Sequence, residues 1–201
     1  MLRHGESEWN VAGRWQGWAD VPLTPRGESE AGRRAAQLAR DGVRPRAVYA
    51  SDLVRASRTA EILAAHLEVP LVVHEGFRER DVGEWSGLTN DEIDAGWPGE
   101  RERWRRGEIP SPPGGETDAA LLARLDHALT DALAHVGTGL LIIVAHNGNL
   151  RAAARRAGSD LGPTRVPNLS GFWFTVTPAG DLRDPQPVGT LPDEDLHGDI
   201  E

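Results

Sequence analysis

The 201-residue sequence contains no cysteine and no lysine. Without cysteine, the chain cannot form disulfides, thiolate nucleophiles, or zinc and iron–sulfur sites that need cysteine ligands. Without lysine, it has no side-chain amine to act as a nucleophile or to form a Schiff base. All 22 basic residues are arginine. Cationic chemistry in this protein therefore falls to guanidinium and imidazole groups.

The sequence also lacks an excess of positive charge and any long apolar segment. It has 22 basic and 31 acidic residues, with a net charge of −9, whereas proteins that bind nucleic acid or anionic membranes present a basic surface. We expect neither partner. No apolar run approaches the roughly 20 residues of a membrane helix, and no signal peptide precedes the first motif. The default expectation is the cytoplasm. A homodimer is one possibility, because the sequence does not determine the oligomeric state.

What is present fits one globular domain. Hydrophobic residues make up 39% of the chain and charged residues 26%, and a chain of this length is most often one domain with a substantial core. We predict a single domain over residues 1–183 and an acidic, mobile tail over residues 184–201. For residues 86–116 we predict a lid-like insertion of short helices and a loop that lies over the functional site.

Helical and strand patterns alternate along the chain. Helices are predicted from Thr24 as N-cap to a stop at Gly42, over residues 53–67, and from Thr117 as N-cap to residue 136. Strands are predicted over residues 47–50, 69–73 and 140–145, followed by a terminal hairpin over residues 171–177 and 182–183. This order predicts an α/β three-layer sandwich with a mostly parallel central sheet.

Three segments place histidine or arginine where a predicted strand ends. They are Leu2-Arg3-His4-Gly5-Glu6, Val144-Ala145-His146-Asn147-Gly148, and the run from Ser51 to Ala60 that contains Arg55. Functional sites of parallel sheets form beyond the carboxyl ends of the strands. Two imidazoles and two guanidinium groups suit phosphoryl transfer, in which one histidine attacks phosphorus and the cations hold the phosphoryl oxygens.

With these segments, the chain resembles the histidine phosphatase superfamily, also called phosphoglycerate mutase-like. Five blocks carry the resemblance in the family's order: Arg3-His4-Gly5-Glu6 with Asn10, Arg14, Gln16-Gly17 and Asp20; Ser51-Asp52-Leu53 with Arg55-Ala56 and Thr59-Ala60; Phe77-Arg78-Glu79 with Gly83-Glu84-Trp85-Ser86-Gly87; Pro113-Gly114-Gly115-Glu116-Thr117; and Val144 to Gly148. The resemblance implies the phosphoglycerate mutase-like sandwich.

The resemblance also implies roles for five catalytic residues. His4 is the expected nucleophile, which forms a phosphohistidine, and Arg3 and Arg55 are expected to clamp the phosphate. His146 is expected to donate a hydrogen bond to the same phosphoryl group. Glu79 is the expected general acid and base, because it occupies the family's Leu-Arg-Glu position. Without the resemblance, other glutamates would be equal candidates: Glu6, Glu75 and Glu84.

Further residues match positions that line the family's phosphate pocket. Asn10, Gln16 and Gly17 are expected there, with Asn147 as an additional donor, although a role in a turn fits Gln16 equally well. Other assignments complete this interpretation: Arg58 on the surface, Asp20 and Glu116 structural, and Trp18, Trp85, Trp97 and Trp104 as candidate pocket walls. Two histidines and a glutamate could also suggest a metal site, but the nearby arginines would repel a cation. We therefore expect no metal and no cofactor.

The leading hypothesis is a phosphatase that hydrolyses a small phosphomonoester of the sugar phosphate or phosphoglycerate type. A cofactor-dependent phosphoglycerate mutase is the alternative within the family, although mutases tend to be longer and Trp104-Arg105-Arg106-Gly107-Glu108 only partly resembles their Arg-Arg stretch. A non-catalytic protein that binds a phosphorylated ligand is a third alternative. One departure from the family is that only Met1 and Leu2 precede the first motif, so we expect a short central strand and a natural start further upstream.

Overall fold

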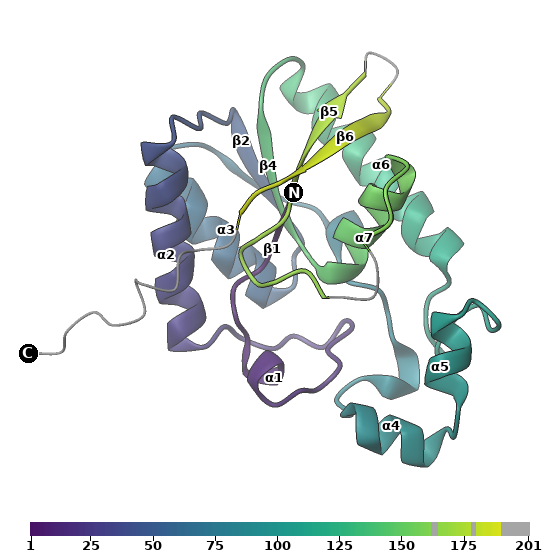
Figure 1. The fold of residues 1–201 in the computed structure, drawn as a ribbon. Coiled ribbons are helices and arrows are strands. Elements are labelled where there is room, and N and C mark those ends of the chain that lie inside the picture. The colour runs from purple at the N-terminus through teal and green to yellow at the C-terminus, as the bar shows by residue number, and fades with distance from the viewer. Residues whose placement is uncertain (162–164, 178–179, 190–201) are drawn as a thin grey trace, which may run out of the picture.

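The computed structural model describes residues 1–161, 165–177 and 180–189 and shows a three-layer α/β sandwich (Figure 1). The central sheet is built of four strands: β1 (Leu2–Arg3), β4 (Leu141–Ala145), β2 (Ala47–Ala50) and β3 (Leu71–Val73), in that order. All three pairs of neighbours are parallel. This architecture confirms the fold class that the sequence predicts.

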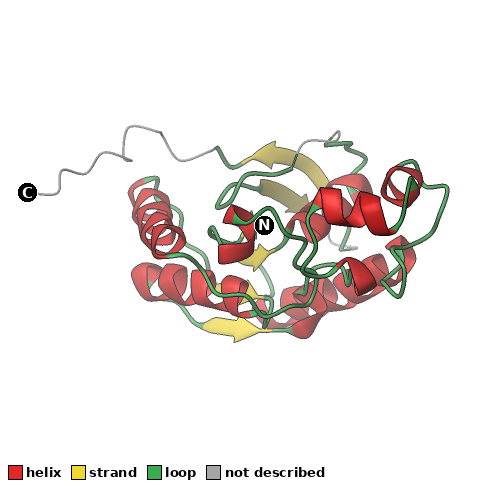
Figure 2. Ribbon diagram, turned by 90° about the horizontal axis from the view of Figure 1, so that it is seen from below, coloured by secondary structure: helices red, strands yellow, loops and turns green. Residues whose placement is uncertain are grey.

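Helices cover both faces of the sheet (Figures 1 and 2). One layer holds α2 (Pro25–Arg40) and α3 (Val54–Leu67), and the other holds α6 (Asp118–Val136) and α7 (Asn147–Arg156). In β4, Ile142 and Val144 pack into the core on the α2–α3 side, and Ile143 and Ala145 pack into the core on the α6–α7 side. Side chains that alternate between two apolar layers explain why this strand is an unbroken apolar run.

The helices begin where polar caps predict. Thr24 Oγ1 accepts a hydrogen bond from Gly27 N at 2.9 Å, and Thr117 Oγ1 accepts one from Ala120 N at 3.2 Å. Both helices then start at the next residue, because each cap satisfies an N–H that lacks an intrahelical partner.

A hairpin of β5 (Phe172–Val176) and β6 (Leu182–Pro187) follows α7. Gly171 bridges Leu2 in antiparallel orientation, so the hairpin adjoins the β1 edge of the sheet. The tail that the sequence predicts from residue 184 overlaps this hairpin, because β6 extends to Pro187. Two prolines are tolerated there because β6 has a partner on one side only. The rest of the predicted tail, from residue 190, lies outside the described residues.

Residues 86–116 contain two short helices, α4 (Asn90–Gly96) and α5 (Glu100–Arg105). With α1 (Glu8–Val11), they lie at the end of the molecule toward which β1 runs (Figure 1). A small apolar cluster holds α4 and α5. It is formed by Val82, Trp85 and Ile93, with Trp15, Leu88, Trp97 and Trp104 packed against it. Trp85 is fully buried in this cluster. It is therefore a core residue, and the expectation that it walls a substrate pocket is wrong.

Strand β1 is short, as expected, and Met1 before it is buried. The expectation that it is a central strand is wrong, because β1 lies at one end of the four-stranded sheet, where it pairs with β4. The α-amino group of Met1 donates to the carbonyl oxygen of Phe172 at 2.7 Å, which ties the start of the chain to β5. In the part of the chain that the structure describes, no helix is both long and apolar enough to cross a membrane.

Candidate active site

The predicted site residues lie where adjacent parallel strands end. His4 follows β1 directly, His146 follows β4, and Ser51 follows β2. The His4 N–H donates to Ala145 O at 3.0 Å, which extends the strand pairing up to the histidines. The two imidazole rings consequently lie side by side, with centroids 5.1 Å apart and planes tilted by 58°.

His4 is held in one tautomer. Its Nδ1 lies 2.7 Å from Gly5 O, and a carbonyl oxygen can only accept, so Nδ1 carries the hydrogen and Nε2 carries a lone pair. Burial, reinforced by the charges of Arg55 and Arg3, lowers the pKa of His4 well below 6.5. The ring is therefore neutral at neutral pH, and its Nε2 is available as a nucleophile.

His146 is fully buried, and within the described residues neither of its ring nitrogens has a hydrogen-bond partner. Burial lowers its pKa well below 6.5, and the charge of Arg55 acts in the same direction. A buried polar atom without a partner costs about 1–3 kcal/mol. Such an atom beside a candidate nucleophile is available to a ligand.

Arg3 and Arg55 are buried next to the histidines. Arg3 Nη1 donates to Val166 O at 2.7 Å, and Arg55 donates to Gly17 O and Ala19 O, both at 2.8 Å. Burial lowers the pKa of Arg3 to about 9 and that of Arg55 to about 10, so both guanidinium groups stay charged at neutral pH. The Nε atoms of both residues have no partner among the described residues. The site thus holds two oriented cations with unused donors.

Glu79 lies at the N-terminus of α7. Its Oε1 accepts hydrogen bonds from Gly148 N at 3.0 Å and from Arg80 N at 2.8 Å. A Cβ at Gly148 would lie 2.3 Å from this oxygen, so the carboxylate can approach only a glycine. The negative charge of Glu79 opposes the effect of burial on Arg3 and Arg55, because it raises the pKa of both guanidinium groups. Of its rivals, Glu75 and Glu84 are exposed, whereas Glu6 is half-buried and accepts a hydrogen bond from Thr24 Oγ1 at 2.9 Å.

The other predicted binding residues form the loops around this centre. Asn10 Oδ1 accepts from Ser7 N at 3.2 Å, and Gln16 Oε1 accepts from Ser7 Oγ at 2.9 Å. Gly17 supplies a carbonyl to Arg55, and Asn147 Oδ1 accepts from Val166 N at 3.0 Å. All four residues therefore have a structural function. Hydrogen bonds orient the side-chain amides of Asn10, Gln16 and Asn147.

The sequence interpretation assigned Asp20 a structural role, Arg58 a position on the surface and Trp18 a place in the pocket wall. Asp20 Oδ1 accepts from Val54 N at 2.6 Å and so holds the start of α3. Arg58 is exposed and pairs with Glu28 and Glu61. Trp18 is 42% exposed, and its Nε1 donates to Glu79 O at 2.6 Å. Of the tryptophans considered, Trp18 therefore contacts the segment that carries Glu79.

The sequence interpretation missed Arg124, which fixes the backbone around Glu79. Its guanidinium donates to Gly76 O at 3.0 Å, Arg78 O at 2.6 Å and Glu79 O at 2.8 Å. Glu116 accepts from the same guanidinium at 2.7 and 2.8 Å, which balances its charge. A signal was present, because Arg124 lies on the apolar stripe of α6, three residues after Leu121.

The interpretation also missed residues 165–170. Asn168 Nδ2 donates to His4 O at 2.8 Å, Gly5 O at 3.0 Å and Asn10 Oδ1 at 3.2 Å. Arg165, three residues earlier, is exposed, and its charge lowers the pKa of Arg3 and of His4. No sequence signal identifies either residue, because about 160 residues separate them from the motif that they contact.

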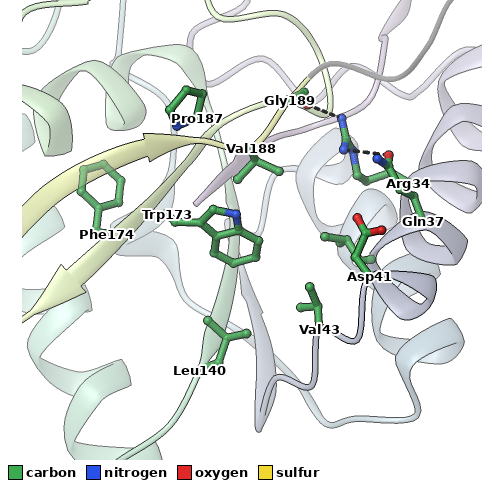
Figure 3. Close-up of a pocket in the computed structure, with 11 residues that line it drawn as sticks. Arg34, Gln37, Asp41, Val43, Leu140, Trp173, Phe174, Pro187, Val188 and Gly189 are labelled. Atoms are coloured by element: carbon green, nitrogen blue, oxygen red, sulfur yellow. Dashed lines mark hydrogen bonds between the residues drawn. The ribbon is translucent and has the colours of Figure 1, made fainter.

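The predicted residues are distinct from the cavity shown in Figure 3. That cavity of about 460 Å³ lies between α2 and the β5–β6 hairpin and is lined by Arg34, Asp41, Trp173 and Val188 among others. Arg34 Nη2 donates to Gly189 O at 2.7 Å on its rim. Across the described residues, no three His, Asp or Glu side chains converge as ligands for a metal ion. The chemistry of the histidine centre therefore has to be argued from imidazole, guanidinium and carboxylate groups.

Comparison with known proteins agrees with this geometry. The profile of the histidine phosphatase superfamily (branch 1) matches residues 1–175. The chain is 36% identical over 174 residues to a 2,3-bisphosphoglycerate-dependent phosphoglycerate mutase of Methylobacterium radiotolerans, which covers 84% of this chain and 82% of that protein. Its homologue from Azorhizobium caulinodans is 38% identical over 158 residues, 76% of this chain and 77% of that protein.

Solved structures extend the comparison to the fold. A mycobacterial glucosyl-3-phosphoglycerate phosphatase in complex with VO3 superposes with a TM-score of 0.80 at 29% identity, covering 94% of this chain and 96% of that one. Bacillus stearothermophilus YhfR gives a TM-score of 0.80 at 29% identity, and the match covers 90% of this chain and 91% of that one. The likeness therefore spans the sheet, both helical layers and the site.

Proposed function

Because this chain belongs to the histidine phosphatase superfamily, we propose that it hydrolyses small phosphomonoesters of the sugar phosphate or phosphoglycerate type through a phosphohistidine on His4. The observation that carries the proposal is the state of the His4 ring. Its Nδ1–H donates to Gly5 O, and burial lowers the pKa of His4 so that the ring is neutral. The centroid of the His146 ring lies 5.1 Å from that of the His4 ring. A neutral imidazole with a fixed tautomer is a prepared nucleophile.

The first step transfers the phosphoryl group to His4. The Nε2 lone pair attacks phosphorus, the bond from phosphorus to the ester oxygen breaks, and Glu79 in its acid form gives its proton to the departing oxygen. Arg3, Arg55 and His146 donate hydrogen bonds to the phosphoryl oxygens. Guanidinium groups match these oxygens with paired donors, and charge that develops in the transition state is stabilised best by donors already in place.

The second step returns the enzyme to its starting state. Glu79, now a carboxylate, takes a proton from water as the water oxygen attacks phosphorus, and the P–N bond to His4 breaks. Inorganic phosphate leaves, His4 is again neutral, and Glu79 is again protonated. One residue thus serves as acid in the first step and as base in the second.

A phosphoglycerate mutase is the second candidate, because the curated relatives carry that name. Chain length does not argue against it, since the match covers 84% of this chain and 82% of a mutase relative. The region that partly resembles the mutase Arg-Arg stretch favours a phosphatase, because Arg105 and Arg106 are about half exposed and lie near Glu102 and Glu108. The similarity to a glucosyl-3-phosphoglycerate phosphatase supports the same choice.

A non-catalytic protein that binds phosphorylated ligands is the third candidate. The buried pair of histidines, the two buried arginines and Glu79 are all present in one centre, which favours catalysis over binding alone. Turnover distinguishes the two, because a binding protein releases no phosphate.

The test measures release of phosphate from 4-nitrophenyl phosphate in the presence of EDTA. In parallel, ³¹P NMR follows 3-phosphoglycerate with 2,3-bisphosphoglycerate. We expect hydrolysis in EDTA and release of inorganic phosphate, because the arginines and histidines supply the positive charge that a metal supplies elsewhere. Conversion to 2-phosphoglycerate without phosphate release would assign the mutase activity instead. Activity that disappears in EDTA and returns with Mg²⁺ would contradict the mechanism.

A further inference from the structure

Residues 165–170 form a wall of the site that is fixed by the backbone. Arg3 Nη1 donates to Val166 O at 2.7 Å, Arg3 N donates to Ser170 O at 2.9 Å, and Leu169 N donates to Arg3 O at 3.0 Å. Asn168 adds the contacts with His4 and Gly5 described above. A side chain that leaves this wall is therefore placed at a defined position relative to Arg3.

Arg165 is the charged residue at the start of this wall, and it is exposed. Its neighbour Val166 contacts both Arg3 and Asn147. After burial, the charge of Arg165 is the largest influence on the pKa of Arg3, which it lowers, and it also lowers the pKa of His4. Because Val166 O lies 2.7 Å from Arg3 Nη1, the side chain of the preceding residue, Arg165, starts beside the Arg3 guanidinium. The direction of its influence on the two pKa values agrees with this position.

The described part of the chain gives Arg165 no ion pair with a carboxylate, whereas the exposed Arg58 and Arg106 each have one. Arg3 and Arg55 carry two positive charges, and Glu79 carries at most one negative charge. A phosphomonoester dianion accounts for the two buried cations, which leaves the charge of Arg165 uncompensated. This surplus lies in a chain whose net charge is −9.

We propose that Arg165 binds a second anionic group of the substrate, a carboxylate or a second phosphate, and so selects phosphomonoesters that carry such a group near the ester. This inference rests on the proposed function and names its substrate class. Guanidinium binds either anion through two parallel donors. Arg165 does not hold the reacting phosphoryl group, because it is exposed whereas Arg3 and Arg55 are buried beside the histidines.

The experiment compares two matched pairs of substrates with wild type and Arg165→Gln. In the first pair, 3-phosphoglycerate has a carboxylate where glycerol 1-phosphate has an uncharged alcohol. In the second, fructose 1,6-bisphosphate has a second phosphate that fructose 6-phosphate lacks. We expect Arg165→Gln to lower kcat/KM about 10–100-fold for the member that carries the second anionic group in at least one pair, the effect of one charge-assisted hydrogen bond. The member without that group should be unaffected. The pair that responds identifies the second anion.

Two variants complete the design. Arg40→Gln removes the same charge from an exposed position, the last residue of α2. The first turn of this helix, at the opposite end, packs against Glu6 near the site. The sixteen-residue helix places Arg40 roughly 20 Å farther away, so this control should not change the substrate ratio. Arg165→Lys should restore part of the lost discrimination.

Equal loss on both members of each pair, or no loss on either, would overturn the inference. If wild type hydrolyses none of the four compounds, the proposed function fails on its own. Calorimetric binding of the same pairs to wild type and Arg165→Gln then decides the inference separately. Equal affinities of wild type for the two members of each pair would overturn it.

Discussion

At the scale of single residues, the site depends on groups withdrawn from water. Burial, reinforced by the adjacent charges of Arg55 and Arg3, lowers the pKa of both His4 and His146 and keeps their imidazoles neutral. The same burial costs the guanidinium groups part of their basicity without removing their charge at neutral pH. A neutral nucleophile among cations is the state that attack on a phosphate dianion requires.

Glu79→Gln should slow poor leaving groups far more than good ones. An alkoxide needs a proton as it departs, whereas a nitrophenolate does not, so removal of the acid affects mainly alkyl phosphates. We expect a loss of about 10²–10⁴-fold in kcat for an alkyl phosphate and a much smaller loss for 4-nitrophenyl phosphate. Equal losses on both substrates would reassign Glu79 to a positioning role.

Acid should destabilise the folded protein through its two buried histidines. The pKa of each lies well below 6.5 in the folded state, so below about pH 6.5 the unfolded chain takes up protons that the folded chain does not. Each histidine then costs the folded state about 1.4 kcal/mol per pH unit, down to its folded pKa. Above pH 6.5 this loss vanishes.

Urea denaturation between about pH 7.5 and 5.5 measures the slope. His146→Gln should reduce the dependence of the unfolding free energy on pH by the contribution of one proton, about 1.4 kcal/mol per pH unit. His66→Gln, at an exposed position of α3, serves as the control. An unchanged slope in His146→Gln would show that His146 is not neutral in the folded protein.

At the scale of elements, one helix positions the proposed acid. Arg124 of α6 holds three carbonyls of the segment that ends at Glu79, those of Gly76, Arg78 and Glu79, and Glu116 balances its charge. Arg124→Gln should lower kcat for alkyl phosphates about 10–100-fold, because small displacements of a catalytic group are costly. KM should change little, since Arg124 is not expected to touch the substrate.

The exposed Arg58→Gln is the matched control and should keep wild-type kcat. If Arg124→Gln raised KM and left kcat unchanged, its role would be in substrate binding. Thermal denaturation of both variants separates this effect from unfolding.

The elements with clear local signals were predictable from the sequence. Thr117 and the apolar stripe of α6 predict a helix that ends at Val136, where α6 ends. The extent of β6 was not predictable, because Pro185 and Pro187 argue against a strand unless its unpaired edge is known. The burial of Trp85 was missed for a similar reason, since its partners Trp15 and Trp104 are distant in the sequence.

At the scale of the whole molecule, the parallel sheet with helices on both faces brings the motifs together. Residues of the N-terminal motif and of the segment after residue 160 share hydrogen bonds because β1 lies beside β4 and the hairpin returns to β1. Local motifs predicted the histidines and arginines of the centre. Arg165 and Asn168 became visible only with the fold, because their contacts are entirely long-range.

The two-sided core also sets the stability of the fold. Ile143→Ala removes a side chain that is 6% exposed in the layer between the sheet and α6, and it should lower the free energy of unfolding by about 2–5 kcal/mol. Val73→Ala, 48% exposed on edge strand β3, should change it by less than about 0.5 kcal/mol. Urea denaturation compares the two. Similar effects at both positions would contradict the layered core.

The central claim is that His4 carries the phosphoryl group, and a trapping experiment tests it most directly. Wild type is mixed with a ³²P-labelled phosphomonoester and quenched in alkali, and the labelled peptide is identified by mass spectrometry. The account predicts label on His4 that survives alkali and is lost in acid, as a phosphoramidate behaves, and no label or turnover in His4→Asn. Label that is stable in acid, label on another residue, or full turnover in His4→Asn would contradict it.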